Sequence, residues 1–169
     1  MEEIDRKRIA ALTEAQQELF RNNTGQSAKT YERAVKVMPG GVPSSFQEND
    51  PWPVYIERGR GSRVWDVDGS EYVDFHNGFG VMCIGHANPT VGAAVKARID
   101  EGTHFAAPTD GSILVAEELA RRFRLPQWRF NNSGTEATMD AVHLARGATG
   151  RDVILKVEGS YHGHHDAVM

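Results

Sequence analysis

In the second half of the sequence, a segment with a helix pattern lies between two segments with strand patterns. Residues 128–131 and 153–157 have patterns typical of short strands, whereas residues 135–148 have the pattern of a helix. Two strands joined through a helix form a βαβ unit, in which the strands lie parallel in one sheet. Parallel strands are covered on both faces, so residues 153–157 are predicted to be a buried strand. The predicted fold class is α/β, with a mainly parallel sheet beginning in this half.

The first half predicts two helices followed by a small antiparallel sheet. Apolar residues at helical spacing predict one helix within residues 1–20 and a second that continues to Pro39-Gly40-Gly41. Beyond Gly41, apolar residues recur at every second position, as in strands, in three short segments: residues 54–56, 63–67 and 71–75. Glycine-rich turns separate the runs, and Asp68-Gly69 is a strong hairpin signal. The three runs are therefore predicted to form an antiparallel meander.

Two further helices are predicted between the meander and the βαβ unit. Asn88 is the predicted N-cap of the first, with Pro89 at its first position and Gly102 after its end, and the second covers residues 112–123. Two parallel strands and a meander do not close a sheet. The chain is therefore expected to be the front part of a larger protein, with an N-terminal segment at residues 1–75 and the incomplete beginning of a larger domain at residues 76–169.

Composition excludes several classes of protein. The 169 residues are 40% hydrophobic and 25% charged, as in ordinary globular chains, and the formal net charge is -4 with no visible basic face. Nucleic acids and anionic membranes are therefore not expected partners. No apolar run approaches the roughly 20 residues of a membrane span, and the start lacks the pattern of a secretory signal. With Cys83 as the single cysteine, a cytoplasmic location is predicted.

The first chemical motif, Asn131-Asn132-Ser133-Gly134-Thr135-Glu136-Ala137, joins the end of a predicted strand to the start of a helix. Hydroxyl groups and free backbone N–H groups at a helix N-terminus can hold an anion, and Gly134 allows a phosphate to approach the backbone. The alternative is that Ser133 or Thr135 only caps the helix, with Glu136 complementing the helix dipole. The motif is neither a Walker loop nor a dinucleotide-binding fingerprint.

The second motif runs from Glu158 to Asp166 and follows the second predicted strand of the βαβ unit. Ligands of α/β sheets bind at this edge. Tyr161 offers a flat face for stacking, and the neighbouring glycines leave space for a planar ligand; the alternative is an aromatic ring packed over a loop. Phosphate binding at one strand end and a ring at the next together predict a phosphorylated planar cofactor.

These motifs, with two earlier ones, resemble the N-terminal part of class III pyridoxal 5'-phosphate-dependent aminotransferases, closest to glutamate-1-semialdehyde 2,1-aminomutase-like members. The segments that carry the resemblance are Val64-Trp65-Asp66-Val67-Asp68-Gly69, Gly85-His86-Ala87-Asn88-Pro89, Ser133-Gly134-Thr135-Glu136-Ala137 and Tyr161-His162-Gly163. The resemblance implies a fold-type I enzyme, pyridoxal 5'-phosphate as cofactor, and a homodimer or larger assembly with active sites at the subunit interface.

The same resemblance implies roles for individual residues. Ser133, Gly134 and Thr135 would bind the cofactor phosphate, and Tyr161 would stack on the pyridine ring, with Glu158 and His162 beside it. The family's Schiff-base lysine lies well beyond the Tyr-His-Gly motif, and no lysine of this chain stands at its position. The catalytic residue is therefore unknown, and Lys156, within a predicted strand, is not expected to serve.

The resemblance also implies substrate contacts at Ser44, Gln47 and Phe79. Aminomutases carry an arginine where this sequence has Gln47, and an amide cannot form a charged bidentate pair with a carboxylate. Phe79 replaces a family tryptophan and keeps an aromatic wall. The predicted function is transfer of an amino group between an amino-acid or amine donor and a keto or aldehyde acceptor, with glutamate-1-semialdehyde 2,1-aminomutase as the alternative.

Two alternatives come from other classes of protein. A metal-dependent hydrolase could use the imidazoles of His162, His164 and His165 with Asp166, although the order of these residues differs from the common hydrolase motif. A non-catalytic binding or dimerisation module would explain the missing lysine but would leave the phosphate and ring motifs without a role. No metal site is predicted for the favoured function.

Overall fold

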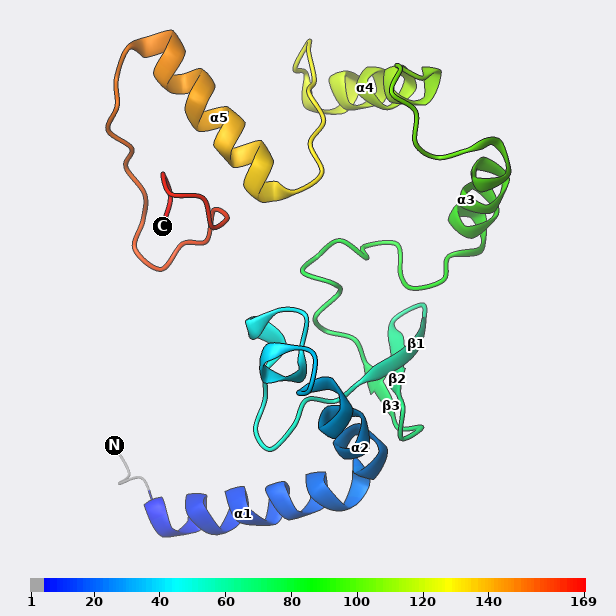
Figure 1. The fold of residues 1–169 in the computed structure, drawn as a ribbon, viewed down its shortest axis with the longest axis vertical. Coiled ribbons are helices and arrows are strands. Elements are labelled where there is room, and N and C mark those ends of the chain that lie inside the picture. Colours follow the sequence, from blue (N-terminus) through cyan, green and yellow to red (C-terminus); the bar gives the residue numbers. More distant parts are fainter. Residues whose placement is uncertain (1–4) are drawn as a thin grey trace. The chain divides into compact units, whose positions relative to one another are not determined.

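The computed structural model describes residues 5–169, which divide into two compact units, one up to Thr103 and the other His104–Met169. Figure 1 gives the order of their helices and strands. The expected division into residues 1–75 and 76–169 stays a prediction.

The first unit begins with two helices, as predicted. Helix α1 (Arg6–Asn23) is capped by the carboxylate of Asp5, which accepts the N–H of Arg8 at 3.0 Å. Helix α2 (Gly25–Ala34) ends earlier than the predicted stop at Pro39. The N–H groups of Val37 and Met38 both bond to the carbonyl of Ala34, so the chain continues in turns rather than as helix. The short helices η1 (Pro39–Gly41) and η2 (Ser45–Gln47) follow.

The predicted antiparallel meander is confirmed, in the order β1 (Ile56–Arg60), β2 (Arg63–Asp66) and β3 (Glu71–Val73). The predicted bounds of its first strand, residues 54–56, are wrong, because the strand begins at Ile56 and continues through Arg58-Gly59-Arg60, a segment expected to be a turn. The Arg58 guanidinium lies 4.0 Å from the ring centre of Trp65, its partner in the register, and this cation–π contact favours the extended backbone. The turn between β1 and β2 falls at residues 61–62 instead.

Asp66 is the fully buried centre of the turn between β2 and β3. Its Oδ1 accepts the N–H groups of Asp68 and Ser70, and its Oδ2 accepts the hydroxyl of Tyr72 at 2.7 Å. Burial raises the pKa of Tyr72, and the hydrogen bond to Asp66 raises it further. Asp66 is therefore a structural carboxylate of the turn, as its spacing predicts.

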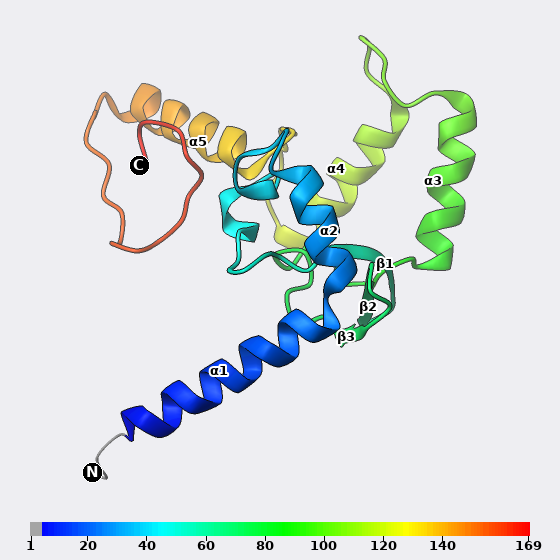
Figure 2. The ribbon, with the colours of Figure 1, turned by 60° about the horizontal axis from the view of Figure 1, so that its bottom comes forward.

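Asp68 joins the meander to helix α2, which lies beside it in Figure 2. Its carboxylate accepts the N–H groups of Gln26 and Ser27 at 2.6 and 3.0 Å and the Ser27 hydroxyl at 2.6 Å. Thr24, at the N-cap position, gives no side-chain cap, so Asp68 supplies the cap from a distant turn. Burial raises the pKa of Asp68, but the hydrogen bonds from Ser27 and Gln26 outweigh it and leave the pKa below 3.8.

Replacing Asp68 by alanine is expected to lower the free energy of unfolding by about 1 to 2 kcal/mol, the usual cost of a lost helix cap. Because the pKa of Asp68 is depressed in the folded state, this contribution is present above pH 3.8 and is lost as the pH falls below it. Urea denaturation at pH 7 and at pH 3 measures both effects. Asp100→Ala, at an exposed carboxylate of another helix, is the control, and equal destabilisation by the two variants would contradict the capping role.

Three helices follow the meander. Helix α3 (Pro89–Glu101) closes the first unit and begins and ends as predicted, with the Asn88 side chain accepting the N–H groups of Thr90 and Val91 and Gly102 at the C-cap. The second unit contains α4 (Asp110–Phe123) and α5 (Gly134–Thr149). None of the helices described in residues 5–169 is both long and apolar enough to cross a bilayer.

The two predicted parallel strands are not formed. Neither residues 128–131 nor residues 153–157 are strands, and Val153, Leu155 and Val157 are 90, 97 and 74% exposed rather than buried. A parallel strand is stabilised by hydrogen bonds to its neighbours and by helices on both faces. Within the described residues these two segments do not pair with each other, so neither acquires that support.

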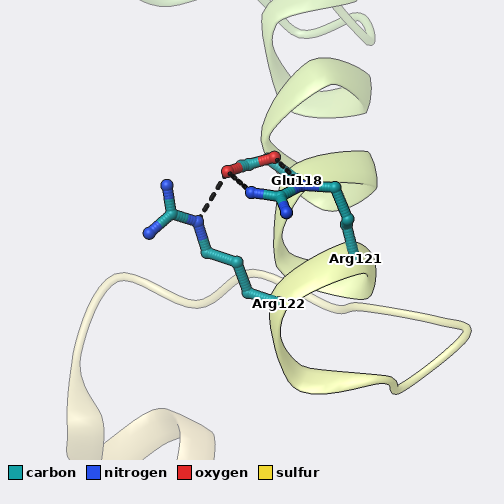
Figure 3. A network of polar contacts seen from close by, with 3 residues as sticks. All are labelled: Glu118, Arg121 and Arg122. Atoms are coloured by element: carbon teal, nitrogen blue, oxygen red, sulfur yellow. Dashed lines mark hydrogen bonds and ion pairs between the residues drawn. The ribbon is translucent and has the colours of Figure 1, made fainter.

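An exposed ion cluster marks the end of α4 (Figure 3). The carboxylate of Glu118 accepts both Nε and Nη2 of Arg121, at 2.8 and 2.7 Å, and Nε of Arg122 at 2.6 Å. The hydrogen bonds from Arg121, and then those from Arg122, lower the pKa of Glu118 from 4.5 to about 2. Both guanidinium groups are thus occupied within their own helix.

The carboxyl carbon of Glu118 is expected to titrate near pH 2 in a ¹³C NMR titration. The depressed pKa means that its stabilising contribution is full above pH 4.5 and disappears as the pH falls through about 2. Arg121→Ala should move the midpoint back towards 4.5, since it removes the largest cause of the shift. A midpoint near 4.5 in the unmodified protein would show that the cluster does not persist in solution.

Candidate functional site

The N-terminus of α5 carries the first predicted motif, and Ser133 is its N-cap. Ser133 Oγ accepts the N–H of Glu136 at 3.2 Å and donates to Glu136 Oε2 at the same distance. Glu136 Oε2 also accepts the N–H of Asn132, one residue before the N-cap, at 2.8 Å, which gives a variant of the capping box. The capping interpretation is therefore confirmed for Ser133.

Gly134 and Thr135 remain open to a ligand. They are the first residues of α5, where backbone N–H groups have no partner within the helix, and among the described residues no acceptor bonds to either N–H group. Thr135 Oγ1 takes no part in the capping box. Two free N–H groups and one hydroxyl at the positive end of a helix are suited to a phosphate.

The structure brings the second predicted motif to this helix end. After α5 the chain runs back along the helix (orange to red in Figure 1), and Thr138 Oγ1 donates to the carbonyl of His162 at 2.7 Å. Gly163 has a φ of 97°, and a Cβ added to it would lie 2.7 Å from Thr135 Oγ1. Only glycine allows this approach, so residues 161–163 lie directly against the predicted phosphate site.

Tyr161 and Glu158 lie in the same segment, and both are exposed. The Tyr161 side chain is 79% exposed, which leaves a ring face available to a planar ligand. Glu158 is exposed in a turn closed by the N–H of Ser160 and the carbonyl of Val157 at 3.1 Å. The first and second motifs thus form one surface within the second unit, here called the phosphate-site surface: Ser133, Gly134, Thr135, Tyr161, His162 and Gly163.

The predicted substrate residues lie in the first unit. Gln47 and Phe79 both line a hollow of about 650 Å³ next to the meander. Ser44 is not part of its lining, but its carbonyl accepts the N–H of Gln47 at 2.9 Å and so shapes the turn that carries Gln47. The ring of Phe79 lies 5.0 Å from that of Phe46 and 4.2 Å, edge on, from that of His76. Aromatic side chains therefore form one wall of the hollow, and aliphatic side chains of the meander line the rest together with a few polar ones.

Sequence reasoning missed a hydrogen-bonded aspartate–histidine pair at this hollow. Asp74 Oδ2 and His86 Nε2 are 2.7 Å apart, and both residues line the hollow. The hydrogen bond from His86, followed by that from the N–H of Asn77, lowers the pKa of Asp74 below 3.8. His86 stood in a recognised motif, but nothing in the local pattern indicated that its partner was a carboxylate at the end of β3.

The structure does not support the candidate metal ligands or a catalytic role for Lys156. Among residues 5–169, no three side chains of histidine, cysteine, aspartate or glutamate are grouped so as to hold a metal ion. His162, His164, His165 and Asp166 therefore do not form the site that a metal-dependent hydrolase would need. The ammonium group of Lys156 donates to the carbonyl of Val168.

Known proteins with similar sequences and structures are enzymes of one family. A glutamate-1-semialdehyde 2,1-aminomutase of Methanopyrus kandleri is 46% identical over 145 residues, which are 85% of this chain and 34% of that protein. A structure described as a transaminase with PLP bound is 45% identical, with a TM-score of 0.82, and the match covers 86% of this chain and 34% of that one. A glutamate-1-semialdehyde-aminomutase of Pseudomonas aeruginosa is 32% identical, with a TM-score of 0.89 over 95% of this chain and 36% of that one.

These matches identify the family of the chain. It spans about a third of the length of the curated relatives it matches. The structural matches confirm the predicted α/β, fold-type I architecture, although the parallel strands themselves are not formed here. The model of class III aminotransferases matches residues 45–169, which include the meander, the hollow and the phosphate-site surface. The chain belongs to the class III aminotransferase family.

Proposed function

We propose that the natural protein carrying these residues is a pyridoxal 5'-phosphate-dependent aminotransferase. It would move an amino group from an amino-acid or amine donor to a keto or aldehyde acceptor. The observation that carries this proposal is the close approach of Gly163 to Thr135, which joins a phosphate site to an exposed aromatic ring. Membership of the family and the cofactor of a 45% identical transaminase support the same assignment.

The residues of the phosphate-site surface fit this cofactor. The N–H groups of Gly134 and Thr135 and the Thr135 hydroxyl would bind the phosphate, and the Tyr161 ring would stack on the pyridine. Pyridoxal phosphate, when bound, supplies an electron sink for bonds at the carbon that carries the amino group. His162 and Glu158 would lie beside the ring, and the lysine that attaches the cofactor is proposed to lie outside these 169 residues.

The substrate hollow favours transamination over the aminomutase reaction. Gln47 stands where aminomutases carry arginine, and no arginine or lysine lines the hollow within the described residues. A substrate with a second carboxylate would therefore find no guanidinium or ammonium group there, only the imidazoles of His76 and His86. The aminomutase remains the second candidate, because relatives of that name are 46% identical.

Cofactor binding is tested on the natural protein by its visible absorbance. Added pyridoxal 5'-phosphate should give a coloured protein that borohydride fixes covalently, and the colour should bleach when an amino donor is added. Tyr161→Ala should weaken cofactor binding by removing the stacking face. A natural protein that stays colourless with added cofactor would contradict the proposal.

Two glycine variants test whether the close approach matters. Gly163→Ala is expected to reduce cofactor affinity at least tenfold, because the added methyl group displaces residues 161–163 from Thr135. Gly159→Ala is the matched control: its φ of 78° is also positive, so it carries a similar backbone strain, but a Cβ there meets nothing within 4 Å. Equal losses in the two variants would show that strain alone is responsible.

The remaining parts of the proposal concern location and assembly. A cytoplasmic location follows from the single cysteine, Cys83, and a homodimer from the family resemblance. Small-molecule donors and acceptors are the expected partners, rather than nucleic acids or membranes. Analytical ultracentrifugation of the natural protein checks the dimer.

A further inference from the structure

The loop that carries Phe79 has an unusual backbone. Four consecutive residues, Asn77, Gly78, Phe79 and Gly80, have positive φ angles of 51, 55, 60 and 85°. Asparagine and glycine tolerate this left-handed region, but phenylalanine rarely adopts it, because its Cβ approaches the backbone. Such a conformation persists only where surrounding contacts impose it. We call residues 75–85 the Phe79 loop.

Packing of the Phe79 side chain does not impose this conformation. The side chain is 69% exposed, and its ring contacts are with Phe46, which is also 69% exposed, and with His76 of the same loop. Hydrogen bonds within the loop, such as that from Gly80 N–H to the carbonyl of Asn77 at 2.9 Å, shape the turn but do not attach it to the sheet. The attachment must come from the two ends of the loop.

Asp74 and His86 hold both ends. Asp74 Oδ1 accepts the N–H groups of His76 and Asn77 at 2.9 and 2.8 Å, where the loop leaves β3, and Oδ2 bonds to His86 Nε2 at 2.7 Å, where the loop returns. The side chains of Asp74 and His86 are only 11 and 23% exposed, so water screens their interaction weakly.

His86 is in turn fixed to the meander. Its N–H and carbonyl groups both pair with Gly61 at 2.9 Å, between β1 and β2. Its ring lies over Gly59, where an added Cβ would be 2.6 Å from the ring Cγ. The imidazole therefore has a defined position on the sheet. Asp74 bonds to this imidazole and to the first N–H groups of the loop, and so attaches the loop to the sheet.

We propose that Asp74 and His86 are a positioning pair that fixes the Phe79 loop and thereby the aromatic wall of the substrate hollow. Neither residue needs to touch the substrate for this role. The inference deepens the proposed function, on which its kinetic part rests. Its structural part concerns the protein without cofactor or substrate and can be tested separately.

Hydrogen exchange measured by mass spectrometry tests the structural part on the cofactor-free natural protein. His86→Ala should speed exchange of the amides in residues 75–85 at least tenfold, whereas His86→Gln, which keeps an N–H donor, should restore part of the protection. The matched control is Glu71→Gln, which breaks the exposed pair of Glu71 with Arg63, 3.3 Å apart, on the same meander. Unchanged exchange in the loop of both His86 variants overturns the proposal.

Amino-donor kinetics test the consequence for the hollow. His86→Ala should raise the donor KM about tenfold with a smaller change in kcat and unchanged cofactor affinity, as expected when substrate positioning alone is lost. In a Phe79→Ala background the same substitution should change KM little, because the wall that the pair positions is already absent. Full additivity of the two substitutions overturns the proposal. An unmodified protein that binds no cofactor instead contradicts the proposed function and leaves the exchange result standing.

Discussion

Replacing Thr135 with alanine is expected to weaken binding of pyridoxal 5'-phosphate about tenfold or more, since a hydrogen bond to a charged group contributes about 1.5 to 3 kcal/mol. The Thr135 hydroxyl has no part in the capping box, so the melting temperature of the apoprotein should stay within a few degrees of the unmodified value. Adding Ser133→Ala should weaken binding further and also cost about 1 kcal/mol of stability, because Ser133 caps α5. Equilibrium dialysis and thermal melts measure the two effects.

A threonine at the other end of the same helix provides the control. Thr149 Oγ1 donates to the carbonyl of Ala145 at 2.7 Å, far in sequence from the proposed phosphate site. Thr149→Ala should leave cofactor affinity unchanged. If Thr135→Ala and Thr149→Ala bind the cofactor equally well, the N-terminus of α5 has only its capping role.

Which of Ser133 and Thr135 caps α5 could not be predicted from the sequence. Both hydroxyls stand at the start of a helix, where either can cap it, and the choice depends on the backbone geometry at each position. Glu136, three residues after Ser133, was a usable signal for the capping box. The approach of Gly163 to Thr135 depends on the path of the chain after α5, which local patterns do not encode.

The helices and the meander were largely predictable because their signals are local. Asn88-Pro89 and Gly102 mark the ends of α3, and Asp68-Gly69 marks the turn between β2 and β3. Residues 153–157 have the apolar pattern of a strand, yet Leu155 is almost fully exposed. A strand pattern specifies which side chains can be buried, but pairing needs neighbouring strands.

The hydrogen-bonded pair of Asp74 and His86 could not be predicted for a different reason. The two residues are twelve positions apart, and their contact depends on a loop with four left-handed residues in a row. Asn77 and the two glycines tolerate this left-handed region, but Phe79 rarely adopts it, so the sequence did not predict four such residues in a row. The Phe79 wall was predicted from the family resemblance, whereas the residues that hold it were visible only in the structure.

The natural protein is expected to transfer amino groups between separate donors and acceptors faster than it isomerises glutamate 1-semialdehyde. A guanidinium that pairs with a buried substrate carboxylate contributes about 1.5 to 3 kcal/mol, so its absence at Gln47 should cost the aminomutase reaction roughly 10- to 150-fold in specificity. The aromatic side chains of Phe46 and Phe79 around Gln47 offer that carboxylate no compensation. Half-reactions of the pyridoxal and pyridoxamine forms, followed spectroscopically with each substrate, measure the ratio.

Gln47→Arg is the reciprocal test of this preference. It should raise kcat/KM for the semialdehyde, whereas Gln127→Arg, which adds the same charge at an exposed position outside the hollow, should not. Efficient formation of 5-aminolevulinate by the unmodified protein, with no gain from Gln47→Arg, would mean that another cation holds the carboxylate. Position 47 would then not decide between the two reactions, and the aminomutase would become the better assignment.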